Sequence, residues 1–263
     1  MSYLDDMIVR RRASIADAKR RTPVAAHRDA ALARTDRRDF IASLRAARTD
    51  RAPAIIAEFK RRSPSAGDID LSADAATVAA AYERGGAAAI SVLTEPAVFA
   101  GSLDDLRAAR AAASLPVLCK DFIVDAYQIW EAAAGGADAV LLIAAVLDDN
   151  LLRGLFALAS ALQVTPLVEV HDEAEAVRAY GFGARLIGVN NRHLATFEVH
   201  AGTAARVAAS LPPDCFIVAE SGYRSAEDVA ASGRAGAGAV LVGEALMRAP
   251  DKEMAVRLLR GER

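Results

Sequence analysis

Cysteine is scarce in this chain of 263 residues, which holds only Cys119 and Cys215. Two isolated thiols build neither a disulfide framework nor a metal-ligand cluster, so a reduced, cytoplasmic setting is expected. The sequence also lacks an apolar run long enough to span a bilayer, and its first residues lack the apolar core of a signal peptide. We therefore expect no membrane association.

An excess of charge of one sign is missing as well. The 32 Lys and Arg residues stand against 34 Asp and Glu residues, for a formal net charge of -2. This balance gives no reason to expect nucleic acid as a partner. The four histidines show no metal-site spacing, and no Ser/His/Asp set for nucleophilic catalysis is apparent. Neither a metal nor a cofactor is expected.

Hydrophobic residues, by contrast, make up 53% of the chain, and from residue 54 they fall into eight short runs separated by alanine-rich stretches. This alternation is typical of parallel β/α units. Eight units in a region close to the usual barrel size of about 200–250 residues favour a (β/α)8 TIM barrel. An open doubly wound sheet is the alternative, weakened because no G-x-G-x-x-G follows the first run. The predicted strands are 54–60, 88–94, 116–122, 137–144, 165–170, 184–190, 215–221 and 238–244.

Helix starts are marked by capping side chains. Ser72, Ser102, Asp125 and Ser225 are each expected to accept a hydrogen bond from the first turn of a helix. Residues 1–50 differ from the repeat, since their apolar spacing predicts two amphipathic helices, one around Ile8 and one around Leu44. The expected organisation is a single domain, 1–263, with an N-terminal helical extension at 1–50 and the barrel at 51–263.

The first predicted strand, AIIAEFK, ends in charge. Side chains alternate along a strand, so Ile55, Ala57 and Phe59 share one side while Glu58 and Lys60 share the other. In a barrel the outward side meets the helices and must be apolar, which points Glu58 and Lys60 into the mouth. A structural ion pair at the rim is the competing interpretation of this strand alone.

Polar residues stand at the ends of other strands too. They are Lys120, Glu169, Asn190, Arg192, Glu220 and Ser221. Barrel enzymes carry their active sites at this end of the strands, so these side chains are expected to converge. A lysine beside carboxylates can act as a general acid, and Glu169 can accept a proton. His171 lies just past the fifth strand, where it could line the mouth, but a position in a solvent-exposed loop is favoured.

The last two units suggest what is bound. Ser221–Gly222 and Gly243 each directly precede a helix start, in the two loops where barrels often bind phosphate through backbone N–H groups. Either loop alone is weak support. Together they favour a phosphorylated small-molecule substrate.

A series of motifs resembles that of the indole-3-glycerol-phosphate synthase family across nearly all of residues 50–250. The motifs are IIAEFKRRSPSAGDI, SVLTEPAVFAGSLDDL, LPVLCKDFIVDAYQI, PLVEVHDEAEA, IGVNNRHL, VAESGYRS and VLVGEALMR. The resemblance implies a barrel enzyme of tryptophan biosynthesis, a carbon–carbon carboxy-lyase. Such an enzyme converts 1-(2-carboxyphenylamino)-1-deoxyribulose 5-phosphate to indole-3-glycerol phosphate, losing carbon dioxide and water.

The same resemblance implies roles for individual residues. Lys120 would be the general acid and Glu169 the base of the later dehydration, while Asn190 would orient the substrate. Glu58 would position the lysines, and Lys60 would bind an anionic group of the substrate, donate a proton, or do both. The further residues implied in substrate binding are Ser63, Pro64, Phe99, Phe122, Arg192, Glu220, Ser221, Gly222, Gly243 and Glu244.

For some of these residues a second interpretation stays open, and two positions differ from the family pattern. Core packing is an equal alternative to a substrate-facing wall for Phe59, Phe99 and Phe122. His193 stands where the family often has an acidic residue. Glu244 stands where some members have serine, and it is expected to turn away from phosphate because like charges repel.

Three other functions compete with this one. A phosphoribosylanthranilate isomerase would commonly need a cysteine and an aspartate, a pattern that Cys119 and Lys120 do not supply. A non-catalytic sugar-phosphate binding protein is disfavoured because the proposed catalytic set is intact. A phosphorylation or docking signal in RRSPS is disfavoured because the segment emerges from a buried strand. A monomer is expected, and an oligomer stays open.

Overall fold

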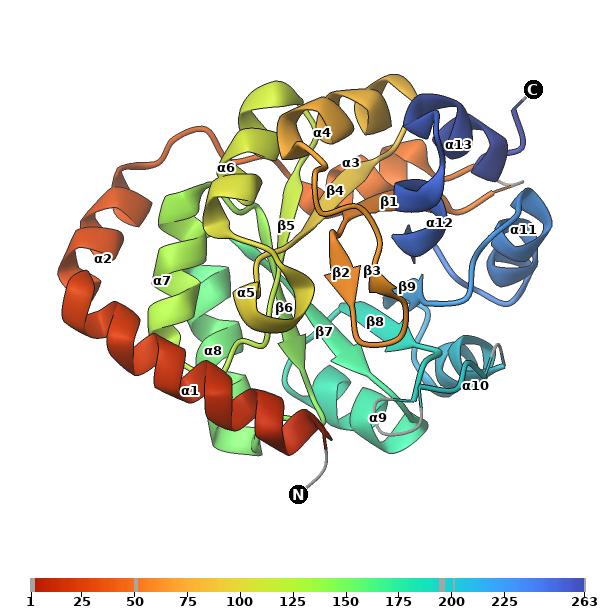
Figure 1. Ribbon diagram of the computed structural model, residues 1–263. Coiled ribbons are helices and arrows are strands. Elements are labelled where there is room, and N and C mark those ends of the chain that lie inside the picture. The colour runs from red at the N-terminus through yellow and green to blue at the C-terminus, as the bar shows by residue number, and fades with distance from the viewer. Residues whose placement is uncertain (1–2, 50–51, 194–196, 201, 263) are drawn as a thin grey trace.

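Eight parallel strands close into a barrel at the centre of the computed structural model, which describes residues 3–49, 52–193, 197–200 and 202–262 (Figure 1). The order around the barrel is β1-β10-β9-β8-β7-β6-β5-β4. These strands are β1 (Ala54–Phe59), β4 (Ala89–Leu93), β5 (Val117–Lys120), β6 (Ala139–Ile143), β7 (Thr165–Val170), β8 (Leu186–Asn190), β9 (Phe216–Glu220) and β10 (Ala239–Val242). The predicted (β/α)8 barrel is confirmed, and every predicted strand contains the observed one.

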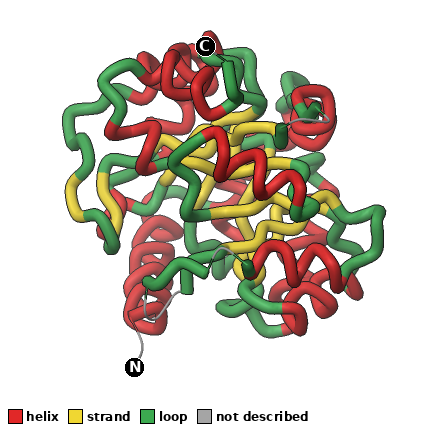
Figure 2. Tube along the Cα trace, turned by 90° about the vertical axis from the view of Figure 1, so that its right-hand side faces the viewer, coloured by secondary structure: helices red, strands yellow, loops and turns green. Residues whose placement is uncertain are grey.

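Helices surround the barrel (Figures 1 and 2). They are α4 (Ala75–Arg84), α5 (Pro96–Phe99), α6 (Leu103–Ala112), α7 (Ala126–Gly135), α8 (Asp149–Ala161), α9 (Glu173–Gly181), α10 (Thr203–Ser210), α11 (Ala226–Arg234), α12 (Glu244–Arg248) and α13 (Lys252–Leu259). Within the described residues, none of the helices has the length and apolar character needed to cross a membrane.

The predicted helix caps are confirmed at three of the four positions. Ser102, Asp125 and Ser225 each accept a hydrogen bond from the backbone of the first helical turn. The prediction for Ser72 is wrong, because α4 begins later and its cap is Asp74, which accepts from Thr77 N at 2.8 Å. The Ser72 hydroxyl instead donates to Asp70 Oδ1 at 2.8 Å, so it serves the preceding turn.

The barrel wall separates two apolar layers, as the alternation along β1 predicts. Ile55, Ala57 and Phe59 belong to the layer between strands and helices, whereas Ile56 belongs to the layer inside the barrel. Phe59 is therefore a core residue and not part of a substrate-facing wall. The guanidinium of Arg61 lies over its ring, 4.9 Å from the centroid.

The N-terminal extension consists of three helices, α1 (Tyr3–Arg21), α2 (Val24–Ala33) and α3 (Phe40–Ala47), where the sequence predicts two. The missed helix, α2, buries only Ala31 and so has no apolar stripe to reveal it. α3 closes one end of the barrel, since Phe40 and Leu44 are fully buried in the inner apolar layer.

Helix α1 reaches the opposite end, where the strands terminate. Its Arg11 makes a two-pronged ion pair with Asp121, Nε to Oδ1 at 2.8 Å and Nη2 to Oδ2 at 2.7 Å. Thr94 Oγ1 donates to the same carboxylate at 2.9 Å. Because Asp121 directly follows the last residue of β5, this contact ties the extension to the mouth of the barrel.

The loop after β1 forms a small antiparallel hairpin, β2 (Arg62–Ser63) with β3 (Gly67–Asp68), where the sequence predicts only a loop. Its two strands stand apart from the barrel at the left of Figure 2. Gly67 has a φ of +65°, which glycine adopts without the steric cost that other residues meet.

Candidate active site

Successive inward positions on the strands change from apolar to charged at the mouth of the barrel. Ile56, Leu118, Leu167 and Val218 belong to the inner apolar layer. Two residues further along the same strands stand Glu58, Lys120, Glu169 and Glu220. The two-residue period of a strand keeps these side chains on the inner side, so the charged groups converge above the apolar floor.

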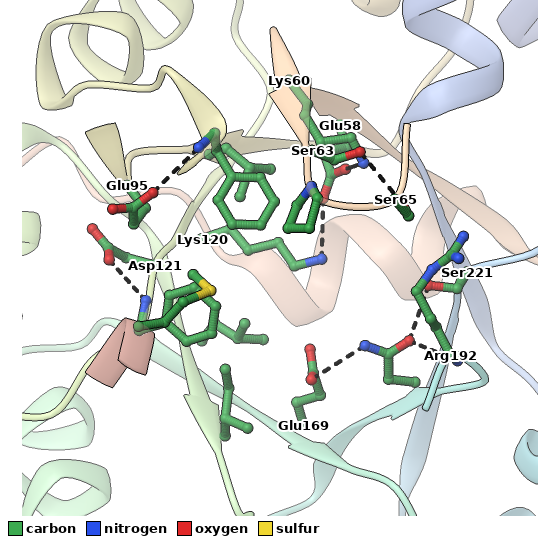
Figure 3. A pocket seen from close by; sticks show the side chains of 18 of the residues that line it. Glu58, Lys60, Ser63, Ser65, Glu95, Lys120, Asp121, Glu169, Arg192 and Ser221 are labelled. Atoms are coloured by element: carbon green, nitrogen blue, oxygen red, sulfur yellow. Dashed lines mark hydrogen bonds and ion pairs between the residues drawn. The ribbon is translucent and has the colours of Figure 1, made fainter. Parts of the chain in front are cut away.

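The five residues predicted to be catalytic line one cavity (Figure 3). They are Glu58, Lys60, Lys120, Glu169 and Asn190. In Figure 3, Lys120 lies between Glu58 on one side of the cavity and Glu169 on the other. The structure thus brings together side chains from β1, β5, β7 and β8.

Glu58 is held between the two lysines. Its Oε1 is 2.6 Å from Lys60 Nζ and its Oε2 is 3.0 Å from Lys120 Nζ, although the residue is only 2% exposed. Burial raises the pKa of Glu58, but the attraction of Lys120 and Lys60 outweighs burial and lowers that pKa to about 2. Glu58 is therefore an anion that orients both ammonium groups.

Lys120 is a half-buried ammonium with carboxylates on several sides. Its Nζ also lies 3.1 Å from Glu220 Oε2. Burial lowers the pKa of Lys120, but Glu220, Glu58 and Glu169 together raise it above its ordinary value. Lys120 therefore carries a proton at neutral pH and can donate it to a developing oxyanion.

Glu220 lies beneath Lys120 and is not among the residues that line the cavity. Burial raises its pKa to about 7, an effect that Glu169 and Glu58 reinforce and Lys120 opposes. Gly188 makes room for this carboxyl group, because a Cβ there would lie 2.5 Å from Glu220 Oε1. Glu220 therefore acts on the site through its ion pair with Lys120.

Glu169 faces the cavity as an oriented carboxylate. Asn190 Nδ2 donates to its Oε1 at 3.3 Å, and the amide orientation is set because Asn190 Oδ1 accepts from Arg192 N and Ser221 Oγ. Burial raises the pKa of Glu169, but His171 and Lys120 outweigh burial and lower it. Glu169 is thus ionised at neutral pH and can accept a proton.

One half of the cleft has an apolar wall beside the charged residues described above. It is lined by Leu4, Met7, Pro64, Leu93, Phe99, Phe122, Leu141 and Ile143. Phe99 and Phe122 both line the cavity, and their ring centroids are 6.3 Å apart. Ser63 lines the same cavity. This half suits a flat aromatic group.

The other half is polar and holds the two glycine-containing loops. It is lined by Ser221, Gly222, Tyr223, Arg224, Gly243, Glu244 and Arg248. Only glycine fits at Gly243, because a Cβ there would lie 2.2 Å from Glu58 Oε1 and 3.1 Å from Lys60 Nζ. Lys60, Lys120, Arg192 and Ser221 line both halves, so the apolar and polar parts form one continuous cleft.

Comparison with known proteins identifies the family. The family model for indole-3-glycerol phosphate synthase matches residues 4–259. The chain belongs to the indole-3-glycerol phosphate synthase family. It is 52% identical to the indole-3-glycerol phosphate synthase of a Nocardioides species over 99% of both chains. It is 48% identical to indole-3-glycerol phosphate synthase 1 of Streptomyces coelicolor, over 97% of this chain and 94% of that one.

Solved structures of other families share the fold of this family member. A 3-hexulose-6-phosphate synthase matches with a TM-score of 0.61 at 17% identity, over 79% of this chain and 98% of that one. The thiamine phosphate pyrophosphorylase of Pyrococcus furiosus matches with a TM-score of 0.60 at 19% identity, over 81% and 95%. At these identities the likeness concerns the barrel alone.

Of the two departures from the pattern of the indole-3-glycerol phosphate synthase family, Glu244 lines the polar half of the cleft and His193 directly follows the lining residue Arg192. His193 is exposed, and its backbone N donates to Glu198 O at 2.9 Å. Glu244 lies 3.1 Å from Arg248 Nε, so its charge is matched by a cation of its own helix. That Glu244 turns away from bound phosphate stays a prediction.

His171 contradicts the expectation of a solvent-exposed loop. Its side chain is 14% exposed and lies between two carboxylates, with Nε2 3.4 Å from Glu169 Oε1 and Nδ1 3.3 Å from Glu175 Oε2. The sequence does contain a signal for this arrangement, since an acidic residue follows four positions after the histidine and two positions before it.

Leu4 and Met7 are further residues of this family member's cleft that sequence reasoning missed. They come from α1, about fifty residues before the first barrel strand. Helical periodicity marks the apolar face of α1, but it carries no information on where that face docks.

Proposed function

We propose that the cleft binds 1-(2-carboxyphenylamino)-1-deoxyribulose 5-phosphate along its length and that Lys120 and Glu169 carry out its ring closure and dehydration. The activity follows from family membership: the enzyme is a decarboxylating lyase that forms the indole ring in tryptophan biosynthesis. The roles of individual residues are the proposal, and they rest on the geometry of the cleft.

The observation that carries the proposal is the division of the cleft. The substrate has an aromatic acid at one end and a phosphate at the other. The apolar half around Phe99 and Phe122 suits the aromatic ring, and the loops of Ser221–Gly222 and Gly243 suit the phosphate. Lys60 and Lys120 line both halves. This puts the two ammonium groups beside the part of the substrate that reacts.

In the first step Lys120 donates its proton to the carbonyl oxygen of the ribulose chain. The ring carbon that bears the carboxylate attacks the carbonyl carbon at the same time, so a carbon–carbon bond forms and the oxygen becomes a hydroxyl. Carbon dioxide then leaves, and the electrons of the broken bond restore the aromatic ring. Glu58 and Glu220 keep the Lys120 ammonium in place.

In the second step the hydroxyl leaves as water with a proton from a lysine. The nitrogen lone pair assists this departure, and Glu169 removes a proton from the neighbouring carbon to complete the indole. Asn190 holds the Glu169 carboxylate in position. Lys60 is placed to donate the proton of this step or to bind an anionic group of the substrate, because it lines both halves.

Three finer statements belong to the same proposal. We place the enzyme in the cytoplasm, a setting that agrees with the two free thiols of Cys119 and Cys215. We propose that it works as a monomer. We also propose that residues 1–263 form a single domain, because α3 is part of the inner apolar layer of the barrel.

The proposal is tested by adding the carboxyphenylamino-deoxyribulose phosphate to purified protein and following indole fluorescence. We expect a fluorescent product and one carbon dioxide for each substrate consumed. Bound substrate without turnover would support a sugar-phosphate binding protein instead.

A further inference from the structure

His171 stands directly behind the proposed base, and the mechanism above gives it no role. It follows the last residue of β7, and its Nε2 is 3.4 Å from Glu169 Oε1. On its other side, Nδ1 is 3.3 Å from Glu175 Oε2, at the start of α9. The imidazole thus spans the gap between the base and a second carboxylate.

Helix capping accounts for only part of this arrangement. Asp172 caps α9 by accepting from Glu175 N at 2.8 Å, and Glu175 Oε2 accepts from His171 N at 2.8 Å. These two hydrogen bonds complete a reciprocal cap that any residue other than proline at position 171 could share through its backbone. The contact from the imidazole to Glu169 adds nothing to the helix, so it needs a separate explanation.

The charges around His171 favour its protonated form. The groups that face it are Glu169 from β7 and Glu175 from α9. Burial lowers the pKa of His171, but these two carboxylates outweigh burial and raise it to about 10. Beyond Glu169 lie Lys120 of β5 and the neutral Asn190 of β8.

Glu169 needs such a partner because its other surroundings work against its charge. It is 2% exposed, and burial disfavours an ionised carboxylate. Glu220, a second carboxyl group of the same barrel mouth, is close enough for their charges to interact. A carboxyl group that took up a proton from solvent could not remove one from the substrate.

We propose that His171 is a positioning residue that, as an imidazolium, keeps the Glu169 carboxylate ionised and aimed into the cleft. This inference rests on the proposed role of Glu169 as the base. No proton passes to His171: Glu169 takes the proton of the substrate, and the imidazolium keeps both of its own. Glu175 holds the ring from behind and supplies the counter-charge.

The decisive variant is His171→Gln, which can still donate a hydrogen bond but carries no charge. Loss of the cation should raise the pKa of Glu169. When the solution is acidified, the variant should therefore begin to lose activity at a higher pH than the wild type does. We expect a shift of the acid limb of kcat by about one pH unit or more, equal to about a tenfold loss at a pH on that limb. KM should change little, since His171 is not among the residues that line the substrate cavity.

Two further variants separate charge from structure. His171→Lys retains a cation, and its acid limb should return toward that of the wild type. His200→Gln is the matched control, because His200 also lies near a carboxylate, 3.7 Å from Glu198 Oε2, but is exposed. That variant should keep the wild-type profile. Glu220 is retained in every variant, so each profile is compared with that of the wild type over the whole pH range.

An equal loss of kcat at every pH in His171→Gln, with the acid limb unmoved, would reduce His171 to a structural residue and overturn the inference. A readout without turnover distinguishes this from failure of the proposed function. In the resting enzyme, NMR of the labelled imidazole should show His171 protonated at pH 8. The Glu169→Gln substitution should lower the pKa of His171 by about one unit or more. A neutral ring at pH 8 would overturn the inference whether or not the wild type is active.

Discussion

Replacement of Glu58 by glutamine tests the central ion-pair cluster. The substitution keeps the shape of the side chain and removes the charge that lies 2.6 Å from Lys60 Nζ and 3.0 Å from Lys120 Nζ. Lys120 keeps Glu220 as a partner at 3.1 Å, so Lys60 is the more affected lysine. A hydrogen bond to a charged group contributes about 1.5–3 kcal/mol. Loss of one such contact predicts a fall in kcat/KM of about tenfold to more than a hundredfold.

The same substitution has two consequences that depend on pH. Glu58 is one of the groups that raise the pKa of Lys120, so its loss should lower that pKa and move the basic limb of the pH–rate profile to lower pH. The folded pKa of Glu58, about 2, lies below its ordinary value of 4.5. The stabilisation of the fold by ionised Glu58 is thus present above pH 4.5 and is lost as the pH falls toward 2. This lowering of the pKa of Glu58 corresponds to about 3 kcal/mol of the free energy of unfolding at neutral pH.

The assay compares Glu58→Gln with Glu227→Gln in steady-state kinetics and in urea unfolding across pH. Glu227 is the matched control, since it pairs with Arg234 at 2.7 Å but is highly exposed. Its loss should change the free energy of unfolding by less than about 1 kcal/mol and leave turnover unchanged. If Glu58→Gln keeps kcat/KM within about threefold of the wild type with both limbs in place, the role assigned to this cluster is wrong.

Three other substitutions test separate parts of the account. Glu169→Gln should release carbon dioxide but accumulate the product of the first step, seen by quenching and chromatography; normal indole formation would exclude it as the base. Gly243→Ala should raise KM at least tenfold because its Cβ meets the Glu58 carboxylate at 2.2 Å, whereas Gly154→Ala, with nothing within 4 Å, should leave KM unchanged. Asp138→Asn should destabilise the fold by about 3–5 kcal/mol in thermal or urea unfolding, because this buried carboxylate pairs with the buried Arg110; equal stability would contradict that pairing.

Much of the fold and the floor of the site could be predicted from local rules. The two-residue period of a strand places Glu58 and Lys60 opposite Ile55 and Ala57, and the inner and outer apolar layers agree with that assignment. The same rule, applied to β5 and β7, predicts that Lys120 and Glu169 face the same cavity. These predictions succeed because a closed barrel fixes the direction of every strand.

Other features depend on contacts between distant segments, and local patterns do not encode them. The ion pair of Arg11 with Asp121 joins residues 110 positions apart in the sequence. It brings α1 to the mouth, where Leu4 and Met7 line the apolar half of the cleft. The prediction of an exposed His171 is wrong for a related reason. A histidine after a strand is commonly exposed, and the burial of His171 depends on the packing of α9 against the end of β7.

The central claim is that Lys120 is the proton donor of ring closure in a cleft that binds the whole substrate. Single-turnover kinetics of Lys120→Ala, combined with substrate binding measured by calorimetry, test it most directly. We predict that the rate of carbon dioxide release falls by more than about a thousandfold while the dissociation constant of the substrate changes by less than about tenfold. A rate within a few-fold of the wild type would contradict the claim.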